Sequence, residues 1–314
     1  MTMLHAFFLV GPTAVGKSAV AQYIAEQAGY AILSADSMVV YRGMDIGTAK
    51  PAPDERKRVP YGGIDIVDAG EEFSVGTYRA AALEFLKLQA AARVPVIVVG
   101  GSGLYVKSLT HGLVNAPQVD KTVRKRWQGV IEKGGVAALQ EALRERAPDV
   151  CAALSDPANP RRLIRALEKL ESGKAGVEDS WHKTGVPVPL VGLDVDRELF
   201  VTRVRQRVER MYRGGLLEEC SRLMSGGNVL SGTAGKAIGY AEAIDFLAGR
   251  CTREEAMART GLRTLQLGKK QRTWFRHQAC VEWLRVEECM TVPDIADAVL
   301  GRWKKLGPVP IAQA

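Results

Sequence analysis

The residues best suited to chemistry form one short motif, Gly11-Pro-Thr-Ala-Val-Gly-Lys-Ser18. It follows the apolar run Ala6–Val10 and precedes Ala19–Ala28, which has helical spacing. Gly11 permits the turn and Gly16 allows close backbone approach, so that N–H groups at the start of a helix can surround a diphosphate. Lys17 adds a positive charge, and the Ser18 hydroxyl is suited to hold Mg²⁺. The pattern predicts a phosphate-binding loop between a strand and a helix.

Alternating strands and helices are expected to position this loop. Four apolar segments are predicted strands: Phe7–Val10, Ala31–Ser34, Gly63–Val67 and Val94–Val99. The segment Ser74–Arg93 has helical spacing, with Ser74 as a possible N-cap. This β-α-β pattern predicts a doubly wound parallel sheet flanked by helices, an α/β fold. Ligands of such sheets bind at the carboxyl ends of the strands. Three polar clusters follow strands there: the phosphate loop, Ser34–Ser37 and Gly100–Tyr105.

The character of the sequence changes near residue 113. Helical segments are expected near 120–133, 135–147 and 161–172, followed by a loop over Gly173–Pro189 and a strand at Pro189–Val195. The last third is expected to be helical, and the tail from Gly307 disordered. The predicted organisation is a phosphate-loop core of residues 1–112 and 189–290, an inserted helical domain of residues 113–188, and a C-terminal helix with a disordered tail over 291–314.

The charge of the 314-residue chain is distributed unevenly. The net charge is +8, yet the first 112 residues hold ten basic and ten acidic side chains, so the whole excess lies later. A polyanionic partner such as nucleic acid and a merely solvated basic surface are equally compatible with this excess. No apolar run is long enough to span a bilayer, so we expect a cytoplasmic protein without membrane contact, acting as a monomer. Five cysteines without a C-x-x-C pair indicate buried thiols rather than disulfides or zinc.

The segment 259–276 gives the nucleic-acid interpretation its best support. It carries six basic residues and no acidic one. Trp274 and Phe275 lie among them and could stack on bases, although the spacing fits core residues equally well. In the predicted helix 161–172, Arg162, Arg165 and Lys169 form a basic face opposite an apolar stripe.

Several motifs, taken in order, resemble one enzyme family. They are the phosphate loop, SADSMVVYRGMDIGTAKP (34–51), GGSGLY (100–105), RRLIRALE (161–168), AIGY (237–240) and KKQRTWFR (269–276). This set resembles the tRNA dimethylallyltransferases. The resemblance implies a phosphate-loop core with a helical insertion. It also implies transfer of a dimethylallyl group from dimethylallyl diphosphate to N6 of the adenosine 3′-adjacent to the tRNA anticodon, position 37.

The resemblance also implies roles for individual residues. Asp36 would be the general base, Ser102 a hydroxyl near the amine, and Lys17 a catalytic cation. The diphosphate would be bound by Gly11, Thr13, Ala14, Val15, Gly16, Lys17, Ser18, Arg203 and Arg207. The anticodon loop of tRNA would be contacted by Asp36, Ser37, Met38, Val39, Ser102, Arg124, Arg161, Arg162, Leu163, Ile164, Arg165, Lys236, Gly239, Tyr240, Lys269, Lys270, Gln271, Arg272, Trp274 and Arg276.

The sequence departs from the family pattern at five positions. The family usually has Thr at Ser102, His near Tyr61, Asp at Asn159, Lys or Arg at Ala241 and Arg at Lys270. Most of these departures concern tRNA contacts rather than the chemistry.

Other functions remain compatible with the phosphate loop. A small-molecule or nucleotide kinase would use the same loop on ATP, and a related enzyme could prenylate a free adenine nucleotide. A non-catalytic RNA-binding protein is the alternative from another class. The basic, aromatic segment 259–276 argues against the other enzymes, and Asp36 at a strand end beside the loop argues against a binder without chemistry.

Overall fold

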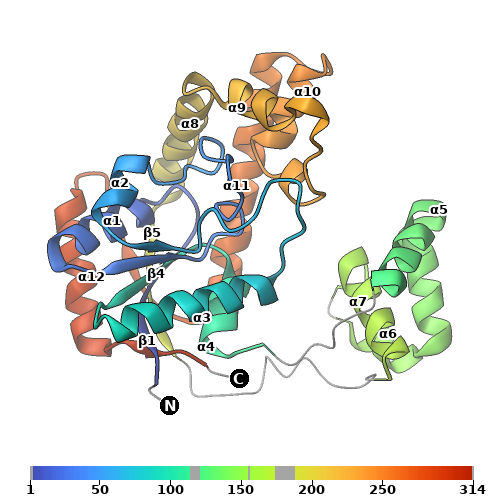
Figure 1. Cartoon of the computed structure of the whole chain (residues 1–314), viewed down its shortest axis with the longest axis horizontal. Helices are drawn as coiled ribbons and strands as arrows, with labels where there is room; N and C mark the ends of the chain where they lie inside the picture. Colours follow the sequence, from blue (N-terminus) through green and yellow to red (C-terminus); the bar gives the residue numbers. More distant parts are fainter. Residues whose placement is uncertain (1–2, 114–120, 155, 174–187, 313–314) are drawn as a thin grey trace. The chain divides into compact units, whose positions relative to one another are not determined.

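The computed structural model describes residues 3–113, 121–154, 156–173 and 188–312 (Figure 1). The chain divides into two compact units, residues 1–112 with 186–313 and residues 113–185. We call them unit 1 and unit 2 and describe each by itself. Most of the loop expected over Gly173–Pro189 lies outside the described residues.

Unit 1 is built on one mostly parallel sheet with the strand order β3-β2-β4-β1-β5-β6. These strands pair in parallel, and β7 pairs antiparallel with β1. Strands β2 and β4 are buried throughout, as expected when helices cover both faces of a parallel sheet. The predicted fold class is therefore confirmed. The strands are β1 (His5–Val10), β2 (Ala31–Ser34), β3 (Tyr61–Gly62), β4 (Val96–Gly100), β5 (Pro189–Asp194), β6 (Cys280–Arg285) and β7 (Val309–Pro310).

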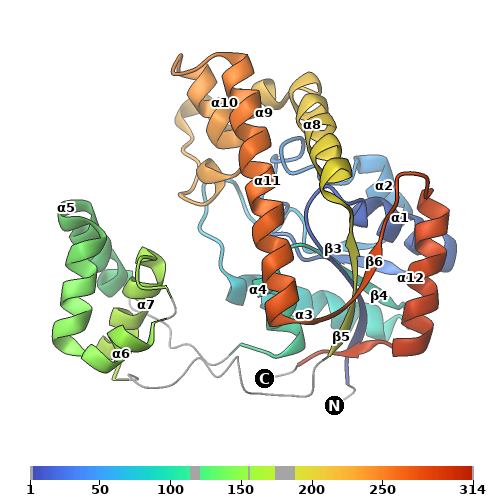
Figure 2. The ribbon, with the colours of Figure 1, turned by 180° about the vertical axis from the view of Figure 1, so that it is seen from behind.

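Helices cover both faces of this sheet (Figures 1 and 2). Helices α1 (Lys17–Ala28) and α12 (Val292–Leu306) pack together on one face. Helices α3 (Val75–Ala91), α4 (Gly103–Thr110) and α11 (Arg253–Gln278) lie on the other face, as right-handed crossovers require. The Ser74 hydroxyl accepts a hydrogen bond from the Thr77 N–H, which confirms the predicted N-cap.

A group of helices lies beyond the carboxyl ends of the strands. Helix α8 (Arg197–Arg213) runs beside α11, and α10 (Tyr240–Leu247) packs on α9 (Leu216–Leu223) and α11 (Figure 2). Short elements complete the unit: α2 (Pro53–Arg58) and the 3-10 turns η2 (Ser225–Gly227) and η3 (Ala234–Lys236).

Unit 2 is helical and has its own core. It comprises α5 (Lys121–Arg146), α6 (Pro148–Ala153) and α7 (Pro160–Glu171). Its helix α5 is interrupted at Gly135, which has a φ of 66° and a non-helical ψ. The buried residues of this core are Trp127, Leu139, Leu143, Leu163, Ala166 and Leu167.

Three sequence-based expectations are wrong. Strand β3 ends at Gly62 instead of spanning Gly63–Val67, because Gly63 and Asp65 have positive φ values that interrupt an extended strand. Strand β6 was not expected, since its edge pattern buries fully only Leu284. The tail is ordered as far as residue 312, where β7 pairs with β1 and the Ile311 N–H donates to the Leu4 carbonyl.

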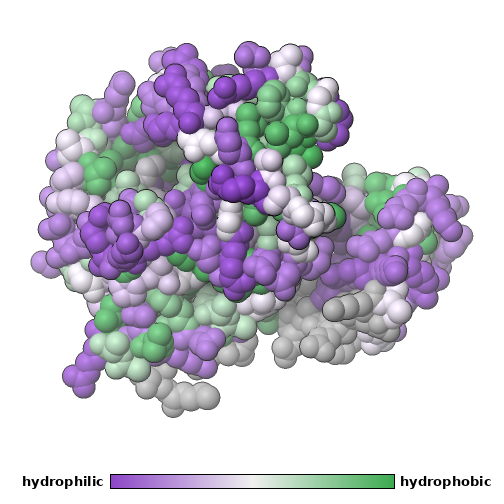
Figure 3. All heavy atoms as spheres, turned by 45° about the horizontal axis from the view of Figure 1, so that its top comes forward, coloured by the Kyte–Doolittle hydropathy of each residue, from purple (hydrophilic) through white to green (hydrophobic). Residues whose placement is uncertain are grey.

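The face drawn in Figure 3 is mainly hydrophilic, as expected from the composition, but most cysteines are less buried than expected. Smaller hydrophobic patches interrupt this face. Within the described part of the chain, no helix is long and apolar enough to cross a membrane. Of the five cysteines expected to be buried, only Cys220 is, whereas Cys151 and Cys251 are partly exposed. Cys280 and Cys289 are exposed because they lie at the edge strand β6 and in the loop after it.

Candidate active site

The phosphate loop connects β1 to α1 as predicted. Gly11 has a φ of 137°, and a Cβ atom there would lie 2.3 Å from the Leu193 carbonyl oxygen, so only glycine fits beside strand β5. Gly16 has a φ of 98° and precedes the first residue of α1. No side chain caps this helix start, so its N–H groups are available to an anion.

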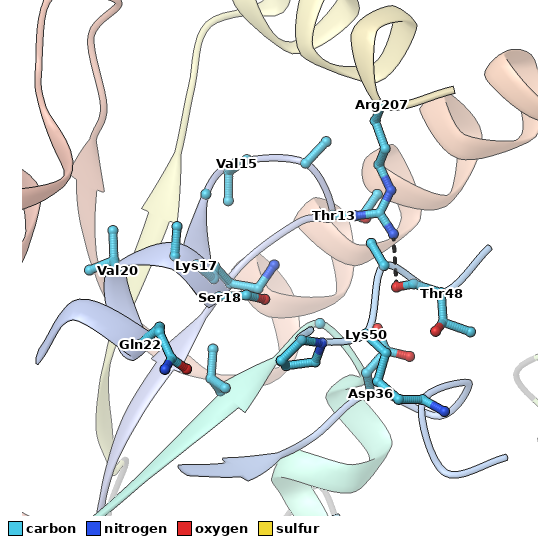
Figure 4. A pocket seen from close by; sticks show the side chains of 18 of the residues that line it. Thr13, Val15, Lys17, Ser18, Val20, Gln22, Asp36, Thr48, Lys50 and Arg207 are labelled. Carbon is cyan, nitrogen blue, oxygen red and sulfur yellow. Dashed lines mark hydrogen bonds between the residues drawn. The ribbon is translucent and has the colours of Figure 1, made fainter. Parts of the chain in front are cut away.

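A cavity of about 750 Å³ opens at the carboxyl ends of β1, β2 and β4 (Figure 4). The phosphate loop forms one wall, and Asp36, Gly100 and Gly101 contribute from the ends of the neighbouring strands. The loop after β2 forms another wall through Ile46, Thr48, Ala49, Lys50 and Pro51. Three polar clusters that are distant in sequence therefore meet, as the strand-end rule predicts.

Five cationic side chains of the described residues line this cavity: Lys17, Lys50, Arg203, Arg207 and Arg210. Lys17 is buried, and its ammonium donates to the Pro12 carbonyl at 2.5 Å. Burial lowers the Lys17 pKa to about 7; Asp36 opposes this shift and Arg207 adds to it. Arg203 donates to the Val15 carbonyl at 3.0 Å, and Arg207 donates to the Thr48 carbonyl at 3.1 Å. Burial also lowers the pKa of both guanidinium groups, so a bound anion would favour their charged forms.

Asp36 is one of two carboxylates in the described chain that line the cavity, the other being Glu55. Asp36 is half-buried after β2, and its Oδ1 accepts a hydrogen bond from the Met38 N–H at 2.9 Å. No helix begins at this point, so Asp36 caps a turn and keeps its second oxygen for other partners. Asp36 attracts both Lys17 and Arg207 electrostatically, which couples the carboxylate to two cations of the cavity.

Helix α11 contributes Gln271 to the same place. Its Oε1 accepts a hydrogen bond from the Thr13 N–H at 2.8 Å, and a Cβ atom at Gly101 would lie 2.3 Å from its amide nitrogen. Trp274, one turn further, packs so closely on Gly103 that a Cβ there would meet the indole at 2.2 Å. Helix α11 therefore braces both the phosphate loop and the loop after β4.

Comparison with known proteins identifies the family. The IPP transferase family model matches residues 39–278, and the isopentenyl transferase model matches residues 4–60. The chain belongs to the IPP transferase family. This confirms the resemblance seen in the sequence motifs.

Named relatives of this IPP transferase cover most of its length. It is 37% identical over 288 residues to a tRNA dimethylallyltransferase of Corynebacterium jeikeium, covering 90% of this chain and 92% of that protein. It is 40% identical over 279 residues to one of Geobacter metallireducens, covering 87% and 90%. The crystal structure of the tRNA isopentenylpyrophosphate transferase from Bacillus halodurans matches with a TM-score of 0.68 at 32% identity, covering 96% and 97%. A eukaryotic dimethylallyltransferase acting on tRNA shares the fold, with a TM-score of 0.75 at 22% identity, covering 96% and 76%.

The residues expected to contact RNA in unit 1 of this IPP transferase fall into three groups by exposure. Lys236, Lys269, Lys270 and Arg276 are exposed. Tyr240 is fully buried, Gly239 is also buried, and Phe275 is a core residue, so the Tyr240 side chain offers no RNA contact. The remaining members of the prediction are partly buried: Ser37, Met38, Gln271, Arg272 and Trp274, with Val39 buried in the cavity wall.

Arg272 is already engaged within the protein. Its Nε donates to Asp194 at 2.7 Å, and its guanidinium lies 4.8 Å from the centre of the Phe200 ring. Its side chain is only 19% exposed. A phosphate contact by Arg272 would have to compete with this pair, so the structure argues for a structural role. Arg276 also pairs with Asp194, at 3.3 Å, but its side chain is 59% exposed.

In unit 2, the expected RNA residues again divide by burial. Arg161 and Arg162 are exposed on α7, whereas Leu163 is fully buried in the unit core and cannot offer its side chain to RNA. Ile164 is partly buried against the same core. Arg124 and Arg165 both pair with the buried carboxylate of Glu168.

Ser102 and Ser18 occupy different positions relative to the cavity. Among the described residues, Gly101 lines the cavity but Ser102 does not. Ser102 precedes α4, and its hydroxyl does not cap that helix. Ser18 is exposed on the cavity side of α1. The described residues contain no group of three or more His, Cys, Asp or Glu side chains that could hold a metal ion. A hydroxyl beside a phosphate-binding loop nevertheless suits Mg²⁺, because this ion takes its other oxygen ligands from phosphates and water.

Sequence reasoning missed several residues around the cavity. Gln22 and Tyr61 line it, with the Tyr61 hydroxyl hydrogen-bonded to Gln22. Lys50 is buried and pairs with Asp65 at 2.7 Å. The sequence signals were the motif 34–51, which contains Lys50 without indicating its role, and the departure from the family pattern at Tyr61.

Proposed function

We propose that this IPP transferase is a tRNA dimethylallyltransferase. It transfers the dimethylallyl group of dimethylallyl diphosphate to N6 of the adenosine 3′-adjacent to the anticodon and releases diphosphate. The observation that carries this proposal is one cavity whose lining includes the phosphate loop, the carboxylate of Asp36 and the cations Lys17, Arg203 and Arg207. The cations suit a leaving diphosphate, and the carboxylate suits the loss of a proton from the acceptor.

The diphosphate side of the cavity assists departure of the leaving group. As the bond between the allylic carbon and the diphosphate oxygen breaks, negative charge gathers on that oxygen. The N–H groups of the loop, Lys17, Arg203 and Arg207 are placed to stabilise this charge. Mg²⁺ held by Ser18 would supply further charge stabilisation to the diphosphate.

The acceptor side removes a proton. The lone pair of the adenine amine is delocalised, so the amine is a poor nucleophile until the C–N bond begins to form. Its proton then becomes acidic, and Asp36 accepts it. The bond formed is C–N, the bond broken is C–O, and the proton passes to the Asp36 carboxylate. The adenine cannot reach this cavity while stacked in a loop, so it must be turned out of the stack.

Basic residues outside the cavity would bind the tRNA. Lys236, Lys269, Lys270 and Arg276 are exposed on unit 1, and Arg161 and Arg162 are exposed on unit 2. Their charges suit the phosphates of an anticodon loop. Through α11, Gln271 joins this surface to the phosphate loop, and Trp274 joins it to Gly103 at the start of α4. We expect the protein to act in the cytoplasm as a monomer.

One experiment tests this function against its alternatives. The protein is incubated with labelled dimethylallyl diphosphate and Mg²⁺, together with either tRNA or ATP, and the labelled product is identified. Label in tRNA supports the proposal. Label in the adenine nucleotide would indicate the adenylate-prenylating alternative, and label in neither, with phosphate transfer from ATP, would indicate a kinase.

A further inference from the structure

Glu219 of helix α9 is a buried carboxylate with an unusual set of partners. Its side chain accepts hydrogen bonds from the N–H groups of Asp45 at 3.1 Å, Ile46 at 3.0 Å and Gly47 at 3.4 Å. The Tyr240 hydroxyl donates a further hydrogen bond at 2.5 Å. Within the described residues, no Lys, Arg or His side chain pairs with Glu219. Three consecutive backbone N–H groups therefore compensate its charge.

The backbone that Glu219 holds belongs to the cavity wall. Ile46 lines the cavity, and Thr48 follows directly after the bound segment. The Thr48 carbonyl is the acceptor for Arg207, as the dashed line in Figure 4 shows. The main chain of residues 45–48 thus connects the Glu219 carboxylate to Arg207.

Close packing fixes the same segment from a second side. A Cβ atom at Gly47 would lie 2.3 Å from the Tyr240 ring and 2.9 Å from Leu216. Tyr240 and Leu216 therefore leave room for glycine alone. The motifs 34–51 and 237–240 therefore meet at Gly47, with Glu219 beside them.

We propose that Glu219 is a positioning residue of the active site, which fixes the Asp45–Gly47 backbone so that the Thr48 carbonyl orients Arg207. Glu219 itself contacts neither substrate. A carboxylate suits this task because its two oxygens accept several N–H groups at once, whereas an amide presents only one acceptor oxygen and adds donors. The inference rests on the proposed binding of diphosphate at this cavity.

The test uses Glu219→Gln with Glu218→Gln as a matched control, because Glu218 is the exposed neighbour on the same helix. Binding of inorganic pyrophosphate with Mg²⁺ is measured by calorimetry, and hydrogen exchange is measured for peptides covering residues 45–48. We expect Glu219→Gln to weaken pyrophosphate binding at least fivefold and to speed exchange in these peptides at least tenfold. Glu218→Gln should match the wild type in both measurements.

The outcomes separate this inference from others. If Glu219→Gln speeds exchange but binds pyrophosphate within twofold of the wild type, Glu219 is only structural and the proposal is overturned. If Glu219→Gln does not fold, Gly47→Ala is the second test, because the added methyl group displaces the same segment from Tyr240. Gly47→Ala should weaken pyrophosphate binding to a similar extent. Wild-type binding by Gly47→Ala would overturn the proposal. If wild-type protein binds pyrophosphate but does not prenylate tRNA, the proposed function fails while the role of Glu219 stays testable.

Discussion

Gln271 and Thr13 are 258 positions apart, yet the Thr13 N–H donates a hydrogen bond to the Gln271 side chain at 2.8 Å. The residue expected at an RNA contact therefore touches the phosphate loop. The Thr13 N–H therefore has a partner within the protein, and a diphosphate oxygen bound at the loop would compete with Gln271 for this N–H.

Removal of this side chain should loosen the phosphate loop. We expect Gln271→Ala to weaken pyrophosphate binding severalfold and to lower the free energy of unfolding by about 1 kcal/mol, the net value of one hydrogen bond. Gln266→Ala is the control, since Gln266 is exposed on the same helix. Titration calorimetry and denaturant unfolding make the comparison. Equal binding by Gln271→Ala and wild type would show that the bond does not shape the loop.

The Lys17 pKa of about 7 predicts a pH dependence of stability without ligand. Between pH 7 and 10.5, Lys17 is protonated in the unfolded chain and neutral in the folded one, so the unfolded state binds more protons and stability rises with pH. Lys17→Met removes this dependence. The difference in unfolding free energy, wild type minus variant, should increase with pH by up to about 1.4 kcal/mol per unit over this range. A flat difference would mean that the folded protein keeps Lys17 charged.

The affinity for diphosphate should change with pH in the direction opposite to the free energy of unfolding. A bound diphosphate favours the charged ammonium, so binding above pH 7 takes up a proton and the affinity falls as pH rises, by at most about tenfold per unit. Lys17→Met should bind more weakly at pH 7 and lack this additional fall. Calorimetry in two buffers of different ionisation enthalpy would detect the proton; no uptake by the wild type would contradict the prediction.

Asp36→Asn should separate chemistry from donor binding. The amide keeps the shape of the side chain but cannot accept the amine proton, so the single-turnover rate should fall by roughly 10² to 10⁴. Pyrophosphate affinity should stay similar, because Asp36 acts on the acceptor. The Asn oxygen can still accept from the Met38 N–H, which preserves the turn. An unchanged single-turnover rate would assign Asp36 to the turn alone.

Ser102 tests a departure from the family pattern. No hydrogen bond of its hydroxyl is found among the described residues, so Ser102→Ala should leave the free energy of unfolding nearly unchanged. We expect kcat to fall about tenfold or more if the hydroxyl bonds the adenine amine or Asp36 in the complex. Ser102→Thr should equal or modestly exceed the wild type, because the methyl group restricts χ1. Normal turnover by Ser102→Ala would leave the hydroxyl without a catalytic role.

The salt dependence of tRNA binding distinguishes exposed from paired cations. Lys270→Ala should reduce the slope of log affinity against log salt by about one, as expected for one lost phosphate contact. Arg272→Ala should instead lower thermal stability, because it leaves Asp194 with Arg276 alone. Filter binding over a salt series and a melting curve give the two readouts. A slope that changes for Arg272→Ala but not for Lys270→Ala would reverse this assignment.

The sequence predicted correctly the elements that a local pattern of residues determines. The phosphate loop and strands β1, β2, β4 and β5 follow from short apolar runs and their flanking glycines, and three of the polar clusters meet as the sheet rule requires. Strand β6 escaped notice because CVEWLR alternates at an edge, with half its side chains exposed. An edge strand lacks the continuous apolar run that marks a buried one.

The remaining differences from the prediction concern which side chains are buried and which are paired within the protein. Tyr240 and Leu163 lie in motifs shared with the family, but a motif does not tell whether a side chain faces solvent or core. Arg272 looks like exposed Lys270 in sequence, and only the fold places Asp194, 78 positions away, beside it. The pair of Arg165 with Glu168 is local, because residues three apart are neighbours on one helix.

The central position of β1 has a consequence for biosynthesis. Strand β1 leaves the ribosome early, but its parallel neighbour β5 begins at residue 189. At 5 to 20 residues per second, the nascent phosphate loop waits about 10 to 40 s for that neighbour and for the Leu193 carbonyl against which Gly11 packs. All of unit 2 is translated within this interval, so its separate hydrophobic core can close while the catalytic sheet is still open on one side.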